Sequence, residues 1–377
     1  MKEWVQRIFL VLISILFCFL FLEFIFKTLA WLQPSQAGPT PIAGLPYENT
    51  PDARFWRYDP EAGLNYYEHN SFGMRGSATT FEKPPGIFRI AFIGDSVAHG
   101  GNVSQGQTTA DYLGLFLGDR QDGRKYEVLN FGVASFGLRE YSILLEKKAF
   151  LFSPDLVLVG LCLNDYYIRG AEDLKMEDKN DPRGRLRERY ANLFKSHFLE
   201  YLRDIVPSLN PRYTFGGSEK VEDQATRKLG ALKGITDGKK KALRDFSRQK
   251  HLPLASFMKL VVNYIPEYRN PEAWIKNEAY IQSIIRACEA RKVPVYFFVY
   301  PLNEQIFPGF DDPMPQPFIQ KLVERNGGQY VEVLRNVKDY QQSNSRQKLY
   351  TRLDHMHLLS AGHRLIARLL AEALERG

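Results

Sequence analysis

The sequence predicts a three-layer α/β/α sandwich, in which helices cover both faces of a parallel sheet. Short apolar segments alternate along the chain with amphipathic segments, as expected for strands that are connected by helices. Most of these apolar segments are apolar along their whole length, which is typical of parallel strands buried on both faces. With 377 residues and 44% hydrophobic side chains, the chain can also bury a large core.

The chain begins with an apolar segment, Ile8 to Phe26, which as a helix of about 19 residues would span about 28 Å. Lys2 and Arg7 precede it. A secretory signal peptide usually has a shorter apolar region and a small-x-small cleavage site, which Ser35-Gln36-Ala37 matches poorly. We therefore predict that residues 1–32 form an uncleaved single-pass anchor in the cytoplasmic membrane. By the positive-inside rule, the catalytic domain then lies outside, in the periplasm or the extracellular space.

The next segments have distinct compositions. Residues 33–53 are rich in proline and glycine, which predicts a stiff, extended spacer rather than a packed element. Residues 54–82 are aromatic without a clear period, and we expect an irregular segment that packs on the main domain. We assign 54–377 to one catalytic domain.

Five strands and five helices account for most of that domain. The predicted strands are Phe88–Ile93, Tyr126–Asn130, Leu156–Leu163, Val293–Tyr300 and Tyr330–Val333. The predicted helices are Thr109–Leu117, Leu138–Phe150, Glu278–Arg291, Pro315–Arg325 and Ala361–Glu375.

The segment from about 166 to 277 is much longer than a connection between a strand and a helix requires. It is highly charged and contains helical patterns at 185–206, 219–233 and 239–249. We predict a largely helical insertion. Because it leaves the sheet beside the expected site, it is either a cap over the substrate or a surface addition.

Four short signatures occur in a fixed order, at the ends of predicted strands and before the last helix. They are Gly94-Asp95-Ser96, Asn130-Phe131-Gly132, Leu163-Asn164-Asp165 and Asp354-His355-Met356-His357. A serine where a buried strand breaks into a loop can present its hydroxyl at the sheet edge. An aspartate and a histidine three residues apart can supply a base and the group that orients it.

Together these signatures resemble the SGNH (GDSL-type) hydrolases, a family named for an ordered serine, glycine, asparagine and histidine. The resemblance covers about 86–165 and 290–375. The segment Asn70–Gly76, here called the lead-in motif, also resembles one found in membrane-anchored bacterial members. The resemblance implies a flavodoxin-like sandwich that hydrolyses esters, or in some members transfers acyl groups, without a metal or other cofactor.

The catalytic assignment names Ser96 as the nucleophile, His357 as the base and Asp354 as the group that orients the imidazole. The resemblance also implies an oxyanion hole made by the backbone N–H groups of Ser96 and Gly132 and the side-chain amide of Asn164. The chain departs from the common family pattern in two places. Ser135 stands where many members carry glycine, and Cys162-Leu163 replaces a small Gly-x pair before Asn164.

The formal charge of +7 comes mainly from basic clusters at 183–189 and 239–244. Clusters of this size are more often solvated helix faces than binding sites, so we predict no nucleic-acid partner. If these clusters bind a ligand, anionic polysaccharide or lipid headgroups agree better than DNA with a membrane segment at the N-terminus. The three cysteines lack the spacing of metal ligands, and we predict neither a metal site nor a cofactor.

The leading interpretation is a membrane-anchored serine esterase that removes acyl groups, most simply acetyl, from a cell-envelope or exported polysaccharide. Envelope polysaccharide machinery would then be a possible partner. Three alternatives remain open. An O-acetyltransferase would use the same triad but pass the acyl group to a sugar hydroxyl. A lipase or lysophospholipase would act on lipid, and an inactive glycan-binding or scaffold protein would have no activity.

Overall fold

The computed structural model describes residues 2–32, 37–38, 42–59, 61–120, 122–166, 236–249, 269–310, 315–351 and 354–376. Contacts divide the chain into two compact units. Helix α1 (Lys2–Leu32) belongs to the first unit, and the elements described after it belong to the second.

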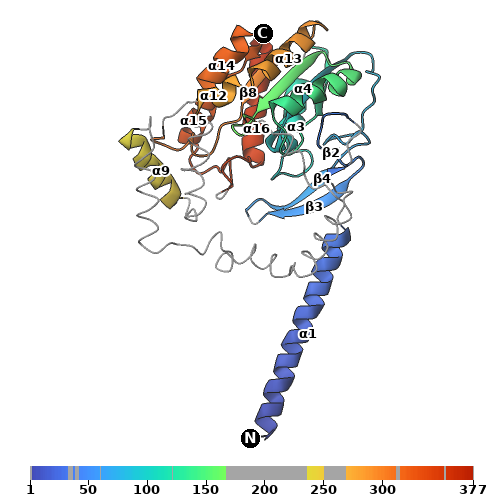
Figure 1. Ribbon diagram of the computed structural model, residues 1–377, viewed down its shortest axis with the longest axis vertical. Coiled ribbons are helices and arrows are strands. Elements are labelled where there is room, and N and C mark those ends of the chain that lie inside the picture. Colours follow the sequence, from blue (N-terminus) through green and yellow to red (C-terminus); the bar gives the residue numbers. More distant parts are fainter. Residues whose placement is uncertain are drawn as a thin grey trace. The chain divides into compact units, whose positions relative to one another are not determined.

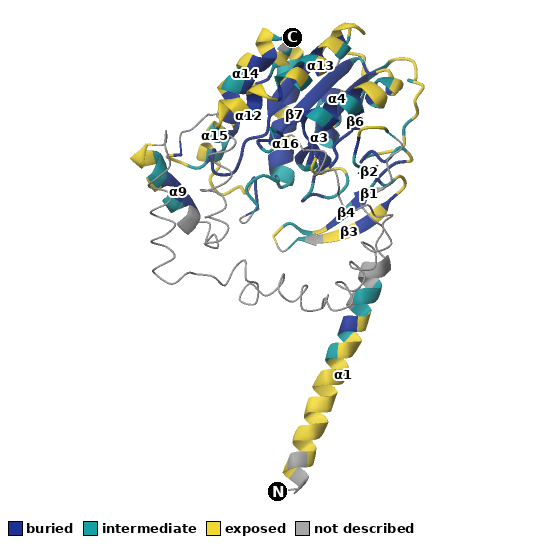
Figure 2. Cartoon of the chain, in the orientation of Figure 1, coloured by how far each residue is buried: buried dark blue, intermediate teal, exposed yellow. Residues whose placement is uncertain are grey.

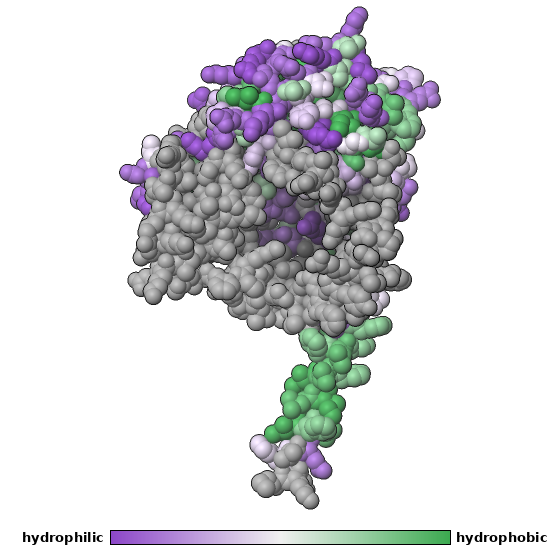
Figure 3. Space-filling model, viewed as in Figure 1, coloured by the Kyte–Doolittle hydropathy of each residue, from purple (hydrophilic) through white to green (hydrophobic). Residues whose placement is uncertain are grey.

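Helix α1 is long and apolar enough to cross a membrane, and its window Gln6–Ile25 has a mean hydropathy of 3.0. A signal sequence near the N-terminus would show the same length and composition. Hydrophobic side chains cover this helix in Figure 3. Near its end, Lys27 and Glu23 form an ion pair at 3.6 Å, one turn apart, so the two charges partly compensate each other.

A five-stranded, all-parallel sheet that includes β8 lies at the centre of the second unit (Figure 1). Its strand order is β6-β5-β7-β8-β9. Its strands are β5 (Ile87–Gly94), β6 (Lys125–Asn130), β7 (Leu156–Leu161), β8 (Val295–Val299) and β9 (Gln329–Tyr330). All five predicted strands are present, although β9 ends earlier than expected. Numbered along the chain the order is 2-1-3-4-5, which is the flavodoxin-like arrangement. The predicted fold class is therefore confirmed.

Helices cover both faces of the sheet, and each face has its own core. Along β5, Phe92 packs into one core and Ile93 into the other, and both are fully buried. The helices α4 (Leu138–Lys147), α13 (Glu278–Glu289) and α14 (Gln316–Arg325) contribute to the core that contains Ile93. The opposite core receives α3 (Thr109–Gly118), α15 (Leu334–Ser343) and α16 (Ser360–Arg376). Figure 2 shows the buried strands between the two helical layers.

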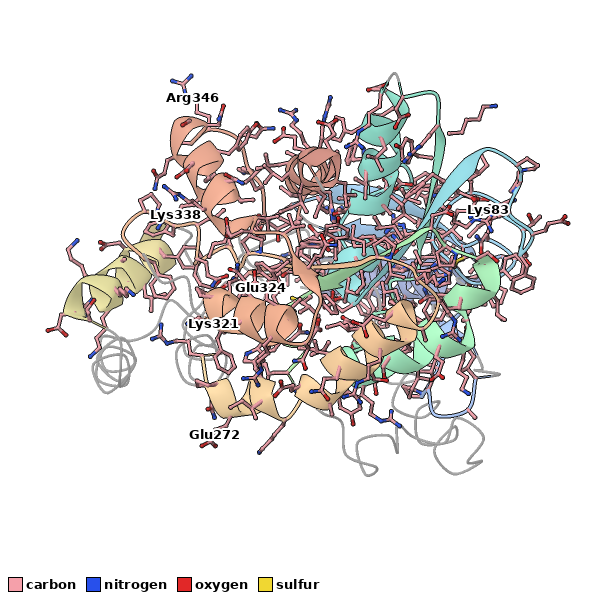
Figure 4. The ribbon with its side chains drawn as sticks, turned by 90° about the horizontal axis from the view of Figure 1, so that it is seen from above. Lys83, Glu272, Lys321, Glu324, Lys338 and Arg346 are labelled. Atoms are coloured by element: carbon pink, nitrogen blue, oxygen red, sulfur yellow. The ribbon has the colours of Figure 1, made fainter. Side chains whose placement is uncertain are left out.

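The remaining helices refine the expected pattern. The predicted helix 138–150 divides into α4 and a short 3₁₀ segment, Ala149–Phe152, while α12 (Pro271–Ile275) and α15 were not predicted. The side chains of Glu272, Lys321 and Glu324 project from the outer surfaces of α12 and α14 (Figure 4). In the insertion, α9 (Asp237–Gln249) confirms one predicted helix. The predicted helices at 185–206 and 219–233 lie outside the described residues.

The expectation of an irregular segment from residue 54 is wrong. Strands β3 (Arg54–Asp59) and β4 (Gly63–Glu68) pair as an antiparallel hairpin. Its inner face buries Phe55 and Tyr67, whose rings stack at 4.9 Å. Trp56, on the other face, is 52% exposed. Aromatic residues on both faces hide the polar–apolar alternation that would reveal a strand.

The predicted spacer is also too long. Strand β1 (Ala37–Gly38) pairs with β2 (Glu48–Asn49), and Leu45 is buried in the core on the α4 side. The side chain of Asn49 donates a hydrogen bond of 3.0 Å to the carbonyl oxygen of Gly132. Apolar packing and this bond place residues 42–53 within the compact body, despite their proline and glycine content.

Candidate active site

Ser96, the proposed nucleophile, lies at the carboxyl end of β5, which pairs with β6 on one side and β7 on the other. Strand β5 ends at Gly94, and Ser96 begins the one-turn helix α2 (Ser96–His99). Asp95 caps this helix, because its Oδ1 accepts the N–H of Val97 at 2.8 Å. A Cβ at Gly94 would lie 2.5 Å from the Cβ of Ala98, so only glycine allows this close turn.

His357 lies within hydrogen-bonding distance of both Ser96 and Asp354. The Nε2 atom of His357 is 2.8 Å from the Oγ of Ser96, and its Nδ1 is 2.6 Å from an Asp354 oxygen. The other oxygen of Asp354 accepts the N–H groups of Met356 at 2.9 Å and His357 at 3.0 Å. A carboxylate can only accept, so Nδ1 carries the proton and Nε2 is left to accept the serine proton.

The neighbouring His355 points its ring to a different partner. Its Nδ1 lies 3.4 Å from the Oε1 of Glu304, a fully buried carboxylate. Its backbone carbonyl accepts the N–H of Asn303 at 2.8 Å. His355 therefore ties the loop that carries the triad to the segment after β8.

The N–H of Gly132, one of the predicted oxyanion donors, has a hydrogen-bond acceptor two residues earlier in the chain. It donates to the side-chain oxygen of Asn130 at 2.9 Å. A Cβ at Gly132 would lie 2.4 Å from the backbone nitrogen of His99. Glycine is therefore required here because the loop after β6 packs against α2, and Asn130 completes the contact by donating to the carbonyl of Ala98 at 2.8 Å.

The same loop contains a second backbone N–H that the sequence analysis did not consider, that of Ser135. Ser135 is exposed and has a φ of 62°. This left-handed conformation favours glycine, which many family members carry at this position. Within the described residues, the N–H of Ser135 has no hydrogen-bond acceptor. The presence of serine where many family members carry glycine was the sequence signal that could have drawn attention to Ser135.

The comparisons with known proteins identify the family of this chain. The family described as GDSL-like lipase/acylhydrolase matches residues 90–370, a range that includes all four signatures. The chain belongs to this family. It is an ester-hydrolysing enzyme, as predicted. A search of curated proteins finds no match.

Several solved structures resemble this acylhydrolase. An α/β hydrolase from the metagenome of Lake Arreo, LAE5, is 16% identical, with 79% of this chain and 98% of that chain covered and a TM-score of 0.41. The acetylxylan esterase Axe2 from Geobacillus stearothermophilus, solved as a catalytic mutant, is 15% identical. That comparison covers 75% of this chain and 92% of that chain, with a TM-score of 0.38.

The third predicted oxyanion donor, Asn164, lies in the turn after β7. The turn is fixed by the buried Asp165, whose Oδ2 accepts the N–H of Cys162 at 2.8 Å and the hydroxyl of Tyr141 at 2.9 Å. The Oδ1 of Asn164 is buried and has no hydrogen-bond partner among the described residues. Within these residues, no group of three or more His, Cys, Asp or Glu side chains is arranged to hold a metal ion.

Replacing Asn164 with alanine should lower the kcat of the acylhydrolase about 10²–10³-fold, the typical loss for one oxyanion donor. The KM should change little, because the oxyanion exists only in the transition state. Steady-state hydrolysis of p-nitrophenyl acetate measures both constants. A fall of less than about threefold would show that Asn164 only shapes the turn.

The contact between Asp354 and His357 also predicts the pH dependence. Burial lowers the pKa of His357, but the charge of Asp354 and its hydrogen bond outweigh burial and raise the pKa above the ordinary 6.5. Only the neutral imidazole acts as a base, so kcat/KM should rise with pH along an acid limb centred above 6.5. In Asp354→Asn this limb should move to lower pH, and kcat should fall about 10³-fold or more. A pH–rate profile with an unmoved limb would contradict the pairing.

Proposed function

We propose that this acylhydrolase works through an acyl-enzyme on Ser96. Two contacts support the proposal. Nε2 of His357 lies 2.8 Å from Oγ of Ser96, and Nδ1 of His357 lies 2.6 Å from Oδ2 of Asp354. Ser96 Oγ attacks the ester carbonyl carbon as its proton passes to Nε2 of His357. The imidazolium then gives that proton to the leaving alcohol as the C–O bond breaks. Water then attacks the acyl carbon as its proton passes to the same nitrogen. The bond between the acyl carbon and Oγ breaks, Oγ takes back the proton from the imidazolium, and the acid is released.

The oxyanion of each tetrahedral intermediate needs donors that are already in place. We assign the N–H of Ser96, which begins α2, and the side-chain amide of Asn164, which follows the neighbouring strand β7. The N–H of Ser135 replaces Gly132 as the third donor, because the N–H of Gly132 is engaged by Asn130.

The proposed substrate is an acylated, most simply acetylated, polysaccharide of the cell envelope or in export. The apolar helix α1 and the formal charge of +7 support an anchored enzyme near anionic glycans. Acetate release from acetylated polysaccharide, measured beside p-nitrophenyl esters of increasing chain length, tests this proposal. Acetyl transfer to an added oligosaccharide in place of release would identify an O-acetyltransferase. A preference for long acyl chains would identify a lipase.

We further propose that α1 is an uncleaved anchor in the cytoplasmic membrane, that residues from 42 onward form the catalytic body, and that this body lies outside. Lys2 and Arg7 before the apolar window support this orientation. Alkaline phosphatase fused after residue 50 should be active, and the mature protein should keep its N-terminus. An inactive fusion would reverse the orientation, and an N-terminus near residue 38 would identify a signal peptide.

A further inference from the structure

The lead-in motif contributes no group to the triad, yet it forms a loop of fixed shape. The side-chain oxygen of Asn70 accepts the N–H groups of Phe72 at 3.0 Å and Met74 at 3.1 Å. Gly73 has a φ of 73°, and a Cβ there would lie 2.4 Å from a backbone oxygen. The motif therefore turns back on itself and directs Arg75 into the protein.

The side chain of Arg75 is buried beneath the last residue of α2 and the loop that follows it, residues 99–103, here called the 99–103 loop. The residue is 2% exposed. Its guanidinium donates to the carbonyl oxygens of His99, at 2.8 Å, and of Gly100 and Val103. Its Cζ also lies 4.1 Å from the ring centroid of Tyr67.

Tyr67 supports the same loop from the β3–β4 hairpin. Its hydroxyl donates to the carbonyl oxygen of Gly101. Arg75 and Tyr67 together therefore hold four carbonyl groups of one short loop. Within the described residues, no carboxylate hydrogen-bonds to Arg75, so its charge is directed at these carbonyls rather than at an ion pair.

The 99–103 loop contacts both partners of the proposed proton transfer. The N–H of Gly101 donates to the carbonyl of Ser96 at 3.1 Å. A Cβ at Gly101 would lie 2.9 Å from Cδ2 and 3.3 Å from Nε2 of His357. The backbone of this loop therefore forms a wall against the imidazole, and a displaced loop would change the 2.8 Å approach of Nε2 to Ser96.

We propose that Arg75 is a positioning residue which, with Tyr67, holds the 99–103 loop against His357 and so keeps its imidazole aligned with Ser96. The proposal rests on the proposed catalytic roles of Ser96 and His357. A planar guanidinium can donate in two directions to carbonyls on neighbouring residues, whereas the single ammonium of lysine acts as a point charge. Lysine at position 75 should therefore hold the loop less rigidly while keeping the charge.

Arg89 offers a matched control, because it is also a buried arginine that donates to three carbonyl groups. Its acceptors are the carbonyl oxygens of Thr80, Phe81 and Phe152, and it forms an ion pair with Glu127 at 2.6 Å. Arg89 lies near the start of β5, whereas Ser96 follows the end of that strand. Its replacement should weaken the fold without moving the 99–103 loop.

The test compares Arg75→Lys, Arg75→Met, Tyr67→Phe and Arg89→Lys in p-nitrophenyl acetate hydrolysis, at a temperature where circular dichroism shows each protein folded. Arg75→Lys should lose about 10–100-fold in kcat, the effect of a misaligned catalytic group, with KM nearly unchanged. The kcat of Tyr67→Phe should be several-fold lower than that of the parent. Arg89→Lys should have a lower Tm but a kcat within about threefold of the parent. Labelling of Ser96 by a fluorophosphonate should slow in parallel with kcat.

A kcat of Arg75→Lys within about threefold of the parent, or an equal loss in Arg89→Lys, would overturn the positioning role. If neither Arg75 variant folds, an unchanged kcat in Tyr67→Phe overturns it. Ser96→Ala in the same series separates the two proposals. An active Ser96→Ala protein would refute the proposed mechanism, whereas an inactive one beside a fully active Arg75→Lys would refute only the positioning role.

Discussion

Replacing Ser96 with alanine is expected to lower the turnover of p-nitrophenyl acetate by about 10⁵-fold or more, since loss of the nucleophile removes the acyl-enzyme route. The Oγ of Ser96 lies 2.8 Å from Nε2 of His357, and no methyl group can replace that donor. The fold should survive, because Ser96 begins a one-turn helix whose cap is the side chain of Asp95.

Ser142→Ala is a suitable control for this experiment. Ser142 lies on α4, and its hydroxyl bonds to the carbonyl of Arg139 within the same helix at 2.8 Å. Its loss should leave kcat within about twofold. Substantial turnover by a folded Ser96→Ala protein would refute the nucleophile assignment.

The second large effect distinguishes two histidines that stand two positions apart. His357→Ala should reduce kcat about 10³-fold or more, because its Nε2, at 2.8 Å, lies closer to the Ser96 hydroxyl than the Asp95 carboxylate at 3.4 Å. His355→Ala should reduce the kcat of the folded enzyme less than about tenfold. His355 contacts the buried Glu304 rather than Ser96, so its loss should appear mainly as a lower Tm.

Kinetics and thermal unfolding of both variants measure these effects separately. Activity is compared at a temperature where both proteins are folded, and Tm is recorded by circular dichroism. A His355→Ala enzyme as inactive as His357→Ala, with both folded, would show that the base has been assigned to the wrong residue.

The parallel sheet could be predicted because its strands are buried on both faces. Phe92 and Ile93 are neighbours in β5, yet each packs into a different core, so the strand shows an uninterrupted apolar run. The β3–β4 hairpin shows no such signal, because the exposed Trp56 obscures the alternation around the buried Phe55. The buried Leu45 likewise shows that a proline- and glycine-rich composition does not exclude packing.

In the candidate site, the sequence could predict contacts between residues that are close along the chain. It could not predict contacts that form only when distant segments meet. Asp354 and His357 are three residues apart, and the aspartate can turn back to the imidazole without help from the rest of the fold. The role of Gly132 depends on Asn130 and on the approach of α2, and no local pattern reveals that approach. The contacts of Arg75 with the 99–103 loop likewise form only when separate segments meet.

The most direct test of the proposed mechanism is to map the residue that a fluorophosphonate modifies. The reagent reacts with a serine whose proton is removed by a neighbouring base, so it reports on the nucleophile and the base together. We expect one label per chain, on the peptide that contains Ser96, and very slow labelling in His357→Ala. A label on another residue, or equal labelling of Ser96→Ala, would contradict the mechanism.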